Sequence, residues 1–278
     1  NVPRIEGDRL FGLGASDMKG AVAVMQALVE TLPLAELPVN VVLVLYEREE
    51  GPYLESGLGP VFDAAPELKR AAFSIAMEPT DGAVQVGCVG SLQVAVRFRG
   101  QAAHSARPWQ GRNAIHAAGD LLQRLHTRER VEVSVSGYSY FEVLSATLAK
   151  GGRARNVVPD EFELNLNYRF APGKSVAQAE ADVRAVVGDV AEVSITDAAP
   201  SGRVCADNAL FTSLVRETGR AAEAKQAWTD VARLSAWGLD AVNFGPGETS
   251  QAHQRAESCS VAALGQSYDV LARFLTAR

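Results

Sequence analysis

The chain has 278 residues, of which 47% are hydrophobic and 22% charged, and its formal net charge is −6. These values are typical of an ordinary globular protein with one large or two ordinary domains. The acidic balance argues against nucleic acid or an anionic membrane as the main partner, and the longest apolar runs are well short of the ~20 residues that span a bilayer.

The three cysteines are far apart and lie outside any Cys-x-x-Cys spacing; they are Cys88, Cys205 and Cys259. An odd number at such spacings predicts neither a disulfide framework nor a thiolate zinc site. The first residues carry no secretory signal pattern. We therefore expect buried thiols in a protein of the reducing cytoplasm.

The first candidate functional residue is Asp17, which follows a Gly-bearing loop and precedes a run of Ala, Val, Met and Leu over residues 21–32. That run predicts a helix, and Ser16 or Asp17 would suit its N-cap. Taken alone, Asp17 is therefore as consistent with a helix cap as with a functional acid.

Residues 39–46 are almost continuously apolar and rich in β-branched side chains. This pattern predicts a central strand of a parallel sheet, buried on both faces. Glu49 and Glu50 follow it, at the strand end where ligands bind in open α/β sheets. A Glu-Glu pair alone is also consistent with a solvated acidic loop.

A second apolar strand is predicted at residues 71–77, and it also ends in an acid, Glu78. Two strands that deliver carboxylates at the same end favour a shared site. With Asp17 and His253, both at predicted loops, the glutamates make a set of hard oxygens and imidazole that suits zinc or a similar divalent ion. The spacing is not diagnostic, because no His-Glu-x-x-His or Cys-x-x-Cys pair is present.

The sequence pattern changes near residue 84, where segments of alternating or β-branched residues separated by glycines begin. Strands, a helix, strands, a helix and a strand predict an inserted α+β sandwich with helices on one face over residues 88–197. Residues 1–87 and 198–278 would then form one α/β domain. Its return segment is predicted to hold helices at 209–222, 230–237 and 261–276, and strands at 224–228 and 241–244.

Five motifs occur in a familiar order: Gly14-Ala-Ser-Asp-Met-Lys-Gly20, Glu49-Glu50, Glu78-Pro79, Gly100-Gln-Ala-Ala-His104 with Gly111-Arg-Asn-Ala114, and His253. Together they resemble the co-catalytic zinc aminoacylase/carboxypeptidase family, which includes acetylornithine deacetylase and succinyl-diaminopimelate desuccinylase. The resemblance extends over essentially the whole chain and is strongest to the bacterial desuccinylases. It implies a cytoplasmic homodimer that hydrolyses the amide of a small N-acyl amino acid, with N-succinyl-LL-2,6-diaminopimelate favoured.

The resemblance also implies two zinc ions per subunit, with Co²⁺ or Mn²⁺ as substitutes. Asp17 would bridge the ions, Glu78 would bind the first, and Glu50 and His253 would bind the second. Glu49 would be the general base that moves a proton from water to the departing amine. The Asp17–Met18 peptide is expected to be cis.

Further roles follow from the same resemblance. His104 would cross a dimer interface and stabilise the oxyanion in the neighbouring subunit. Asn156 and Arg169 would bind substrate carboxylates, and Gly247 of the Gly245–Gly247 loop would line the pocket. On the residues alone, His104 could be a surface histidine and Arg169 an ordinary strand-end ion pair.

One family feature has no match, because the expected His-x-Asp motif is absent and the first histidine is His104. The expected fold class is therefore a zinc-exopeptidase-like α/β catalytic domain, incomplete at its N-terminus, with an inserted dimerisation/lid domain. We expect this chain alone to bind at most one zinc tightly and to turn over poorly. The alternatives are an acetylornithine deacetylase-like or other deacylase, a dipeptidase, or a non-catalytic dimeric binding protein.

Overall fold

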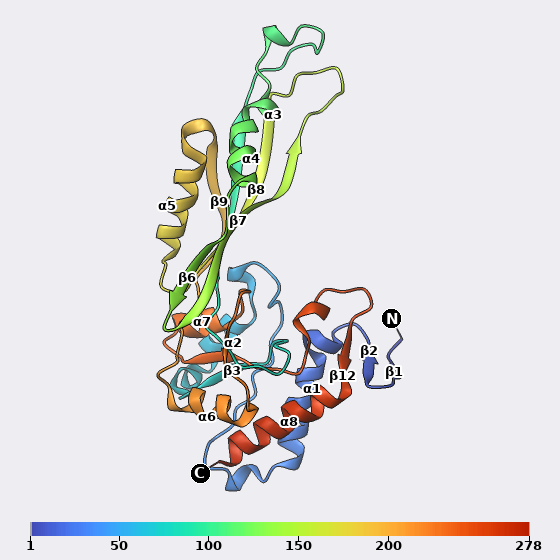
Figure 1. Cartoon of the computed structure of the whole chain (residues 1–278), viewed down its shortest axis with the longest axis vertical. Helices are drawn as coiled ribbons and strands as arrows, with labels where there is room; N and C mark the ends of the chain where they lie inside the picture. Colours follow the sequence, from blue (N-terminus) through green and yellow to red (C-terminus); the bar gives the residue numbers. More distant parts are fainter. Residues whose placement is uncertain (1, 278) are drawn as a thin grey trace. The chain divides into compact units, whose positions relative to one another are not determined.

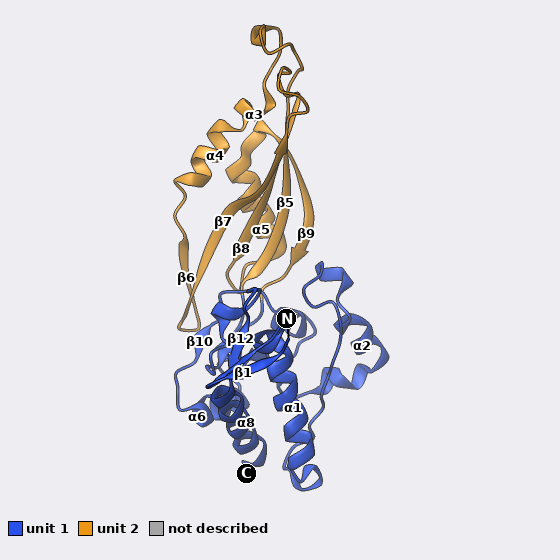
Figure 2. Cartoon of the chain, turned by 90° about the vertical axis from the view of Figure 1, so that its right-hand side faces the viewer, with its two compact units in different colours: residues 1–88, 202–278 blue, residues 89–201 orange. Residues whose placement is uncertain are grey.

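A computed structural model describes residues 2–277, so residues 1 and 278 of the expected α/β domain lie outside the described residues. The chain divides into two compact units (Figure 2). Unit 1 comprises residues 1–88 and 202–278, and unit 2 comprises residues 89–201. The sequence analysis predicts a division at residues 87/88 and 197/198.

Unit 2 is built on one five-stranded antiparallel sheet in the order β6-β7-β8-β5-β9 (Figure 1). Alternation along the strands determines its two faces: in β8, Phe162, Leu164 and Leu166 are buried, whereas Glu161 and Glu163 on the opposite face are not. The strands are β5 (Gly90–Arg99), β6 (Val131–Val135), β7 (Tyr138–Gly151), β8 (Glu161–Phe170) and β9 (Glu192–Ala199).

Three helices cover the apolar face of this sheet and share one hydrophobic core with β5, β7 and β8. Their starts follow from local capping: the Asn113 side chain accepts hydrogen bonds from two backbone N–H groups of α3, and Ser175 and Gln178 form a capping box on α5. The helices are α3 (Ala114–Ala117), α4 (Gly119–His126) and α5 (Val176–Val187). The expected helices-on-one-face sandwich is thus observed.

Unit 1 has much shorter strands in two sheets, an antiparallel one in the order β1-β2-β12 and a mixed one in the order β10-β4-β11-β3. Helices α1 and α8 pack against each other. The strands are β1 (Arg4–Glu6), β2 (Arg9–Phe11), β3 (Ser74–Ala76), β4 (Gln85–Val86), β10 (Glu223–Ala224), β11 (Ala241–Asn243) and β12 (Ser258–Ser260). The helices are α1 (Gly20–Thr31), α2 (Leu58–Ala64), α6 (Ala209–Thr218), α7 (Val231–Ala236) and α8 (Val261–Thr276).

The prediction of a buried central strand at residues 39–46 is wrong for this structure. The segment forms no strand, and its side chains Val42 and Leu45 are each 64% exposed. Val44 and Tyr46 of this segment pack against one core cluster of unit 1. Apolar, β-branched composition favours extended backbone, but a strand also needs a neighbour for its N–H and C=O groups. Within the described chain, β3 pairs with β11 and not with this segment.

The other expected elements appear, in several cases shortened, whereas β1, β6 and β12 were not expected. β12 is only three residues long, so it has too few positions to show a period. None of the helices between residues 2 and 277 combines the length and apolarity that a membrane crossing requires.

Candidate functional site

Asp17 lies in a π-helical turn, Ala15–Lys19, that precedes α1. Its backbone is not helical (φ −124°, ψ 90°), and the Asp17–Met18 peptide is cis, as the family resemblance implied. Helix α1 begins at Gly20 without a side-chain cap, so the reading of Ser16 or Asp17 as its N-cap is wrong. The Ser16 hydroxyl instead donates to the Ser258 carbonyl at 2.9 Å.

The Asp17 turn is held by Glu257, a residue that the sequence analysis did not single out. Its carboxylate is 4% exposed and accepts backbone N–H groups from Gly14 at 2.6 Å and from Ser16 and Asp17, each at 2.8 Å. Three charge-assisted hydrogen bonds fix the direction of the Asp17 backbone. Nothing in its local pattern marked this glutamate, because all its partners lie more than 200 residues away.

Asp17, Glu50 and His253 come from three separate segments, and their ligand atoms all lie within 4.8 Å of one another. His253 Nε2 is 3.1 Å from Glu50 Oε1 and 3.6 Å from Asp17 Oδ2. Two carboxylates and one imidazole converging in this way are a ligand set that zinc accepts.

Glu49 and Glu78 lie outside this three-residue set but interact with it electrostatically. Burial, and then the charge of Glu78, raise the pKa of Glu49 to about 8. Burial, and then the charge of Asp17, raise the pKa of Glu78 to about 7. The pKa of Asp17 is raised as well, by burial and by Glu50.

A buried lysine beside these acids offsets their raised pKa values only in part, since its charge acts on Asp17 and Glu78 and both pKa values stay raised. Lys225 is 6% exposed, its Nζ donates to the Pro79 carbonyl at 3.1 Å, and burial lowers its pKa. A group of carboxyl groups that burial and mutual repulsion drive toward protonation suits a divalent cation, which favours their ionised form. The residues present therefore fit a bound metal ion.

Gly247 lies against the backbone of this site. A Cβ atom at this position would stand 2.2 Å from the Ser16 carbonyl oxygen and 2.9 Å from Pro79 Cβ. The Gly247 carbonyl accepts the Asp81 N–H at 2.8 Å. Only glycine allows the chain to pass so close to the segments that carry Asp17 and Glu78.

The remaining predicted residues belong to unit 2, where His104 and Asn156 lie on two adjoining loops. A bridge pairs His104 with Val157, and the Ser105 N–H donates to the Asn156 carbonyl at 2.9 Å. The Ala106 N–H donates to His104 Nδ1 at 3.1 Å. Because Nδ1 accepts this bond, the neutral ring carries its proton on Nε2, where it is available as a donor.

Arg169 lies at the other end of the same sheet. It pairs with Ser91 near the start of β5, whereas the His104 loop follows Arg99 at the end of β5. Eight residues of extended chain correspond to roughly 27 Å. Within unit 2, the structure therefore brings His104 and Asn156 together but not Arg169 with them.

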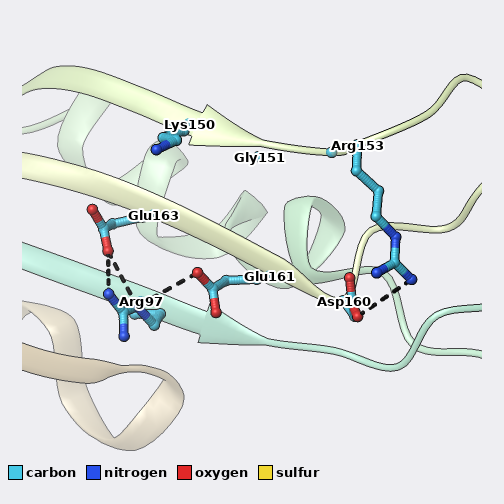
Figure 3. Close-up of a pocket in the computed structure, with 8 residues that line it drawn as sticks. Arg97, Lys150, Gly151, Arg153, Asp160, Glu161 and Glu163 are labelled. Carbon is cyan, nitrogen blue, oxygen red and sulfur yellow. Dashed lines mark hydrogen bonds and ion pairs between the residues drawn. The ribbon is translucent and has the colours of Figure 1, made fainter.

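A hollow of about 340 Å³ in unit 2 contains none of these residues (Figure 3). It lies on the uncovered face of the unit 2 sheet, and ion pairs cross it, from Arg97 to Glu163 at 2.8 Å and from Arg153 to Asp160 at 3.7 Å. Five of its six charged side chains already pair with one another, all except Lys150, so we regard it as a polar sheet surface rather than a ligand site.

Known proteins match both units. A peptidase dimerisation domain profile matches residues 86–194. A Mycobacterium tuberculosis H37Rv protein, provisionally named the succinyl-diaminopimelate desuccinylase DapE, is 40% identical over 99% of this chain and 78% of its own length. The succinyl-diaminopimelate desuccinylase of Corynebacterium glutamicum is 35% identical over 99% of this chain and 77% of its own. The fold matches a Staphylococcus aureus tripeptidase with a TM-score of 0.80 at 20% identity, covering 99% of this chain and 75% of that one.

Proposed function

This chain belongs to the M20 peptidase family of metal-dependent hydrolases, and from that premise we propose that it hydrolyses the amide of N-acyl amino acids, with N-succinyl-LL-2,6-diaminopimelate as the preferred substrate. The observation that carries the proposal is the convergence of Asp17, Glu50 and His253, with which the half-buried Glu49 interacts electrostatically. The preference for the succinyl substrate is supported by the relatives at 35–40% identity that bear this name.

In this proposal four side chains would hold zinc, each in the role that the family resemblance implies: those of Asp17, Glu50, Glu78 and His253. A bound zinc ion acts as a Lewis acid toward the scissile carbonyl and toward water. Glu49 removes a proton from water and delivers it to the departing amine. A carboxyl group whose pKa is raised by burial is suited to both halves of this transfer near neutral pH.

His104 donates from Nε2 to the oxyanion that develops on the scissile carbonyl, and Asn156 binds the substrate beside it. Arg169, which suits bidentate contact with a carboxylate, binds another part of the substrate. Because the roughly 27 Å along β5 exceeds the span of one small substrate, these residues must come from two copies of the chain. We therefore propose a homodimer in which His104 and Asn156 act on the neighbouring copy's substrate, in line with the dimerisation domain profile.

The test is a substrate panel on zinc-loaded, full-length protein: N-succinyl-LL-2,6-diaminopimelate, N-acetylornithine and unblocked dipeptides, with amine release followed over time. We expect the highest kcat/KM for the succinyl substrate. A protein that cleaves only dipeptides or only the acetyl substrate would overturn the substrate assignment. One that binds these compounds and cleaves none would be a non-catalytic binding protein.

A further inference from the structure

Two loops of unit 2, which lie far from β6 in Figure 1, are rich in positive charge, although the second ends in Asp160. Residues 101–112 and 150–157 contain five cations and no Asp or Glu, although the whole chain has a net charge of −6. The cations are Arg107, Arg112, Lys150, Arg153 and Arg155. Such a local excess in an acidic protein favours an anionic ligand at these loops.

Two of these arginines flank the residues to which the proposed function assigns roles. Arg155 immediately precedes Asn156, whose carbonyl accepts the Ser105 N–H at 2.9 Å. The Arg107 N–H donates to the His104 carbonyl at 2.8 Å in the turn that follows. Both arginines therefore belong to the paired loops that carry His104 and Asn156, within three residues of one or the other.

Arg107 and Arg155 differ from their neighbour Arg153 in that Arg153 forms an ion pair. Arg153 forms an ion pair with Asp160 across the hollow of Figure 3. The side chains of Arg107 and Arg155 are exposed, and no ion pair joins either of them to another residue between positions 2 and 277. Each thus presents a planar set of N–H donors that matches a carboxylate.

We propose that Arg107 and Arg155 bind a carboxylate at the far end of the substrate's acyl group, so that the enzyme selects ω-carboxyacyl over acetyl amino acids. This inference rests on the proposed function, in which His104 faces the oxyanion of the scissile carbonyl. That carbonyl belongs to the acyl group, and in a succinyl group the terminal carboxylate lies only two methylene groups beyond it. Long side chains beside His104 can reach that position.

The test compares the variants Arg107→Ala and Arg155→Ala with Arg153→Ala, which removes the same charge from the same pair of loops. For each, kcat and KM are measured on N-succinyl-diaminopimelate and on N-acetyl-diaminopimelate. We expect Arg107→Ala and Arg155→Ala each to raise KM for the succinyl substrate by about 10- to 100-fold, the effect of losing a charged hydrogen bond. The succinyl-to-acetyl ratio of kcat/KM should fall equally, and Arg153→Ala should leave that ratio unchanged.

Arg155→Lys provides a second measurement, because it keeps the charge but not the bidentate geometry, and we expect it to restore part of the lost preference. Equal losses on both substrates, or an equal effect of Arg153→Ala, would overturn the inference while leaving the proposed function in place. If the wild-type protein cleaves neither substrate, the proposed function is wrong and the inference falls with it.

Discussion

Glu142 of unit 2 and the pair Glu49 and Glu78 of unit 1 are acids in opposite environments. In unit 2, Glu142 is 7% exposed, and its carboxylate accepts hydrogen bonds from Lys174 Nζ at 2.7 Å, the Tyr168 hydroxyl at 2.9 Å and the Ala171 N–H at 3.0 Å. In unit 1, burial and mutual repulsion raise the pKa values of Glu49 and Glu78 instead. A structural acid is supplied with donors by its own fold, whereas acids left short of positive charge mark a place for an external cation.

The sharpest test of this contrast is to neutralise one acid in each unit. We expect Glu49→Gln to lower kcat by about 10²–10⁴-fold, the usual share of a general base, without lowering the thermal midpoint. We expect Glu142→Gln to lower the free energy of unfolding by about 1–3 kcal/mol, because the hydrogen bonds to a charged acceptor are weakened, with kcat unchanged. Steady-state kinetics and thermal melts measure both. Equal kinetic effects of the two changes would remove the distinction between the units.

Glu257 resembles Glu142 in having hydrogen-bond donors for its carboxylate, but it lies beside the candidate metal site. We expect Glu257→Gln to weaken zinc binding by about 10- to 100-fold, as for other residues that orient a metal ligand. Titration with a competing zinc chelator measures the affinity. Glu217→Gln is the matched control in unit 1, because the partners of Glu217 are Arg273 of α8, at 3.2 Å, and Arg216 of α6, and not the Asp17 turn. A similar loss in the control would show a general loss of stability instead.

The smallest effect concerns the pH dependence of stability in metal-free protein. The ordinary pKa of 4.5 applies to Glu49 and Glu78 in the unfolded chain, whereas the folded values are about 8 and about 7. The folded state therefore holds more protons in this window, and its stability falls as pH rises from about 5 to about 8. Melts across this range should show a falling thermal midpoint, which Glu49→Gln makes shallower.

The same melts with added zinc should show the opposite trend in zinc-dependent stabilisation. Its ligands must be ionised, so the stabilisation by added zinc should grow over the pH range in which the metal-free protein weakens. The Glu142→Gln variant, whose change lies in the other unit, should keep the wild-type slope. A thermal midpoint that rises with pH in metal-free protein would contradict the raised pKa values of the two glutamates.

Much of the site could be predicted because its residues occur in local motifs. Asp17, Glu50 and His253 each follow a recognisable segment, and the structure brings their ligand atoms within 4.8 Å. Glu257 could not be predicted, since its three partners are distant in the chain and no periodic pattern marks it. Gly247 was predicted to line the pocket, but its close contact with Ser16 and Pro79 appears only in the folded chain.

The strands show the same division between local and distant information. In unit 2, β5 and β8 are ten residues each, long enough for their alternation to reveal which face is buried. Residues 39–46 have an equally clear apolar pattern but no strand partner among the described residues, so their prediction failed. The hydrophobic pattern of a segment indicates which side chains it would bury, but it does not indicate whether another strand is present to pair with it.

Residue chemistry and order along the chain were thus enough to identify the family, the inserted domain and the acids with their histidine. Only the folded chain decided which carboxylates lie together, that Glu257 holds the Asp17 turn, and that Arg169 and His104 stand at opposite ends of one sheet. The reason is physical: motifs and alternation arise from neighbours in sequence, whereas burial, pKa shifts and hydrogen-bond supply depend on groups that meet only after folding.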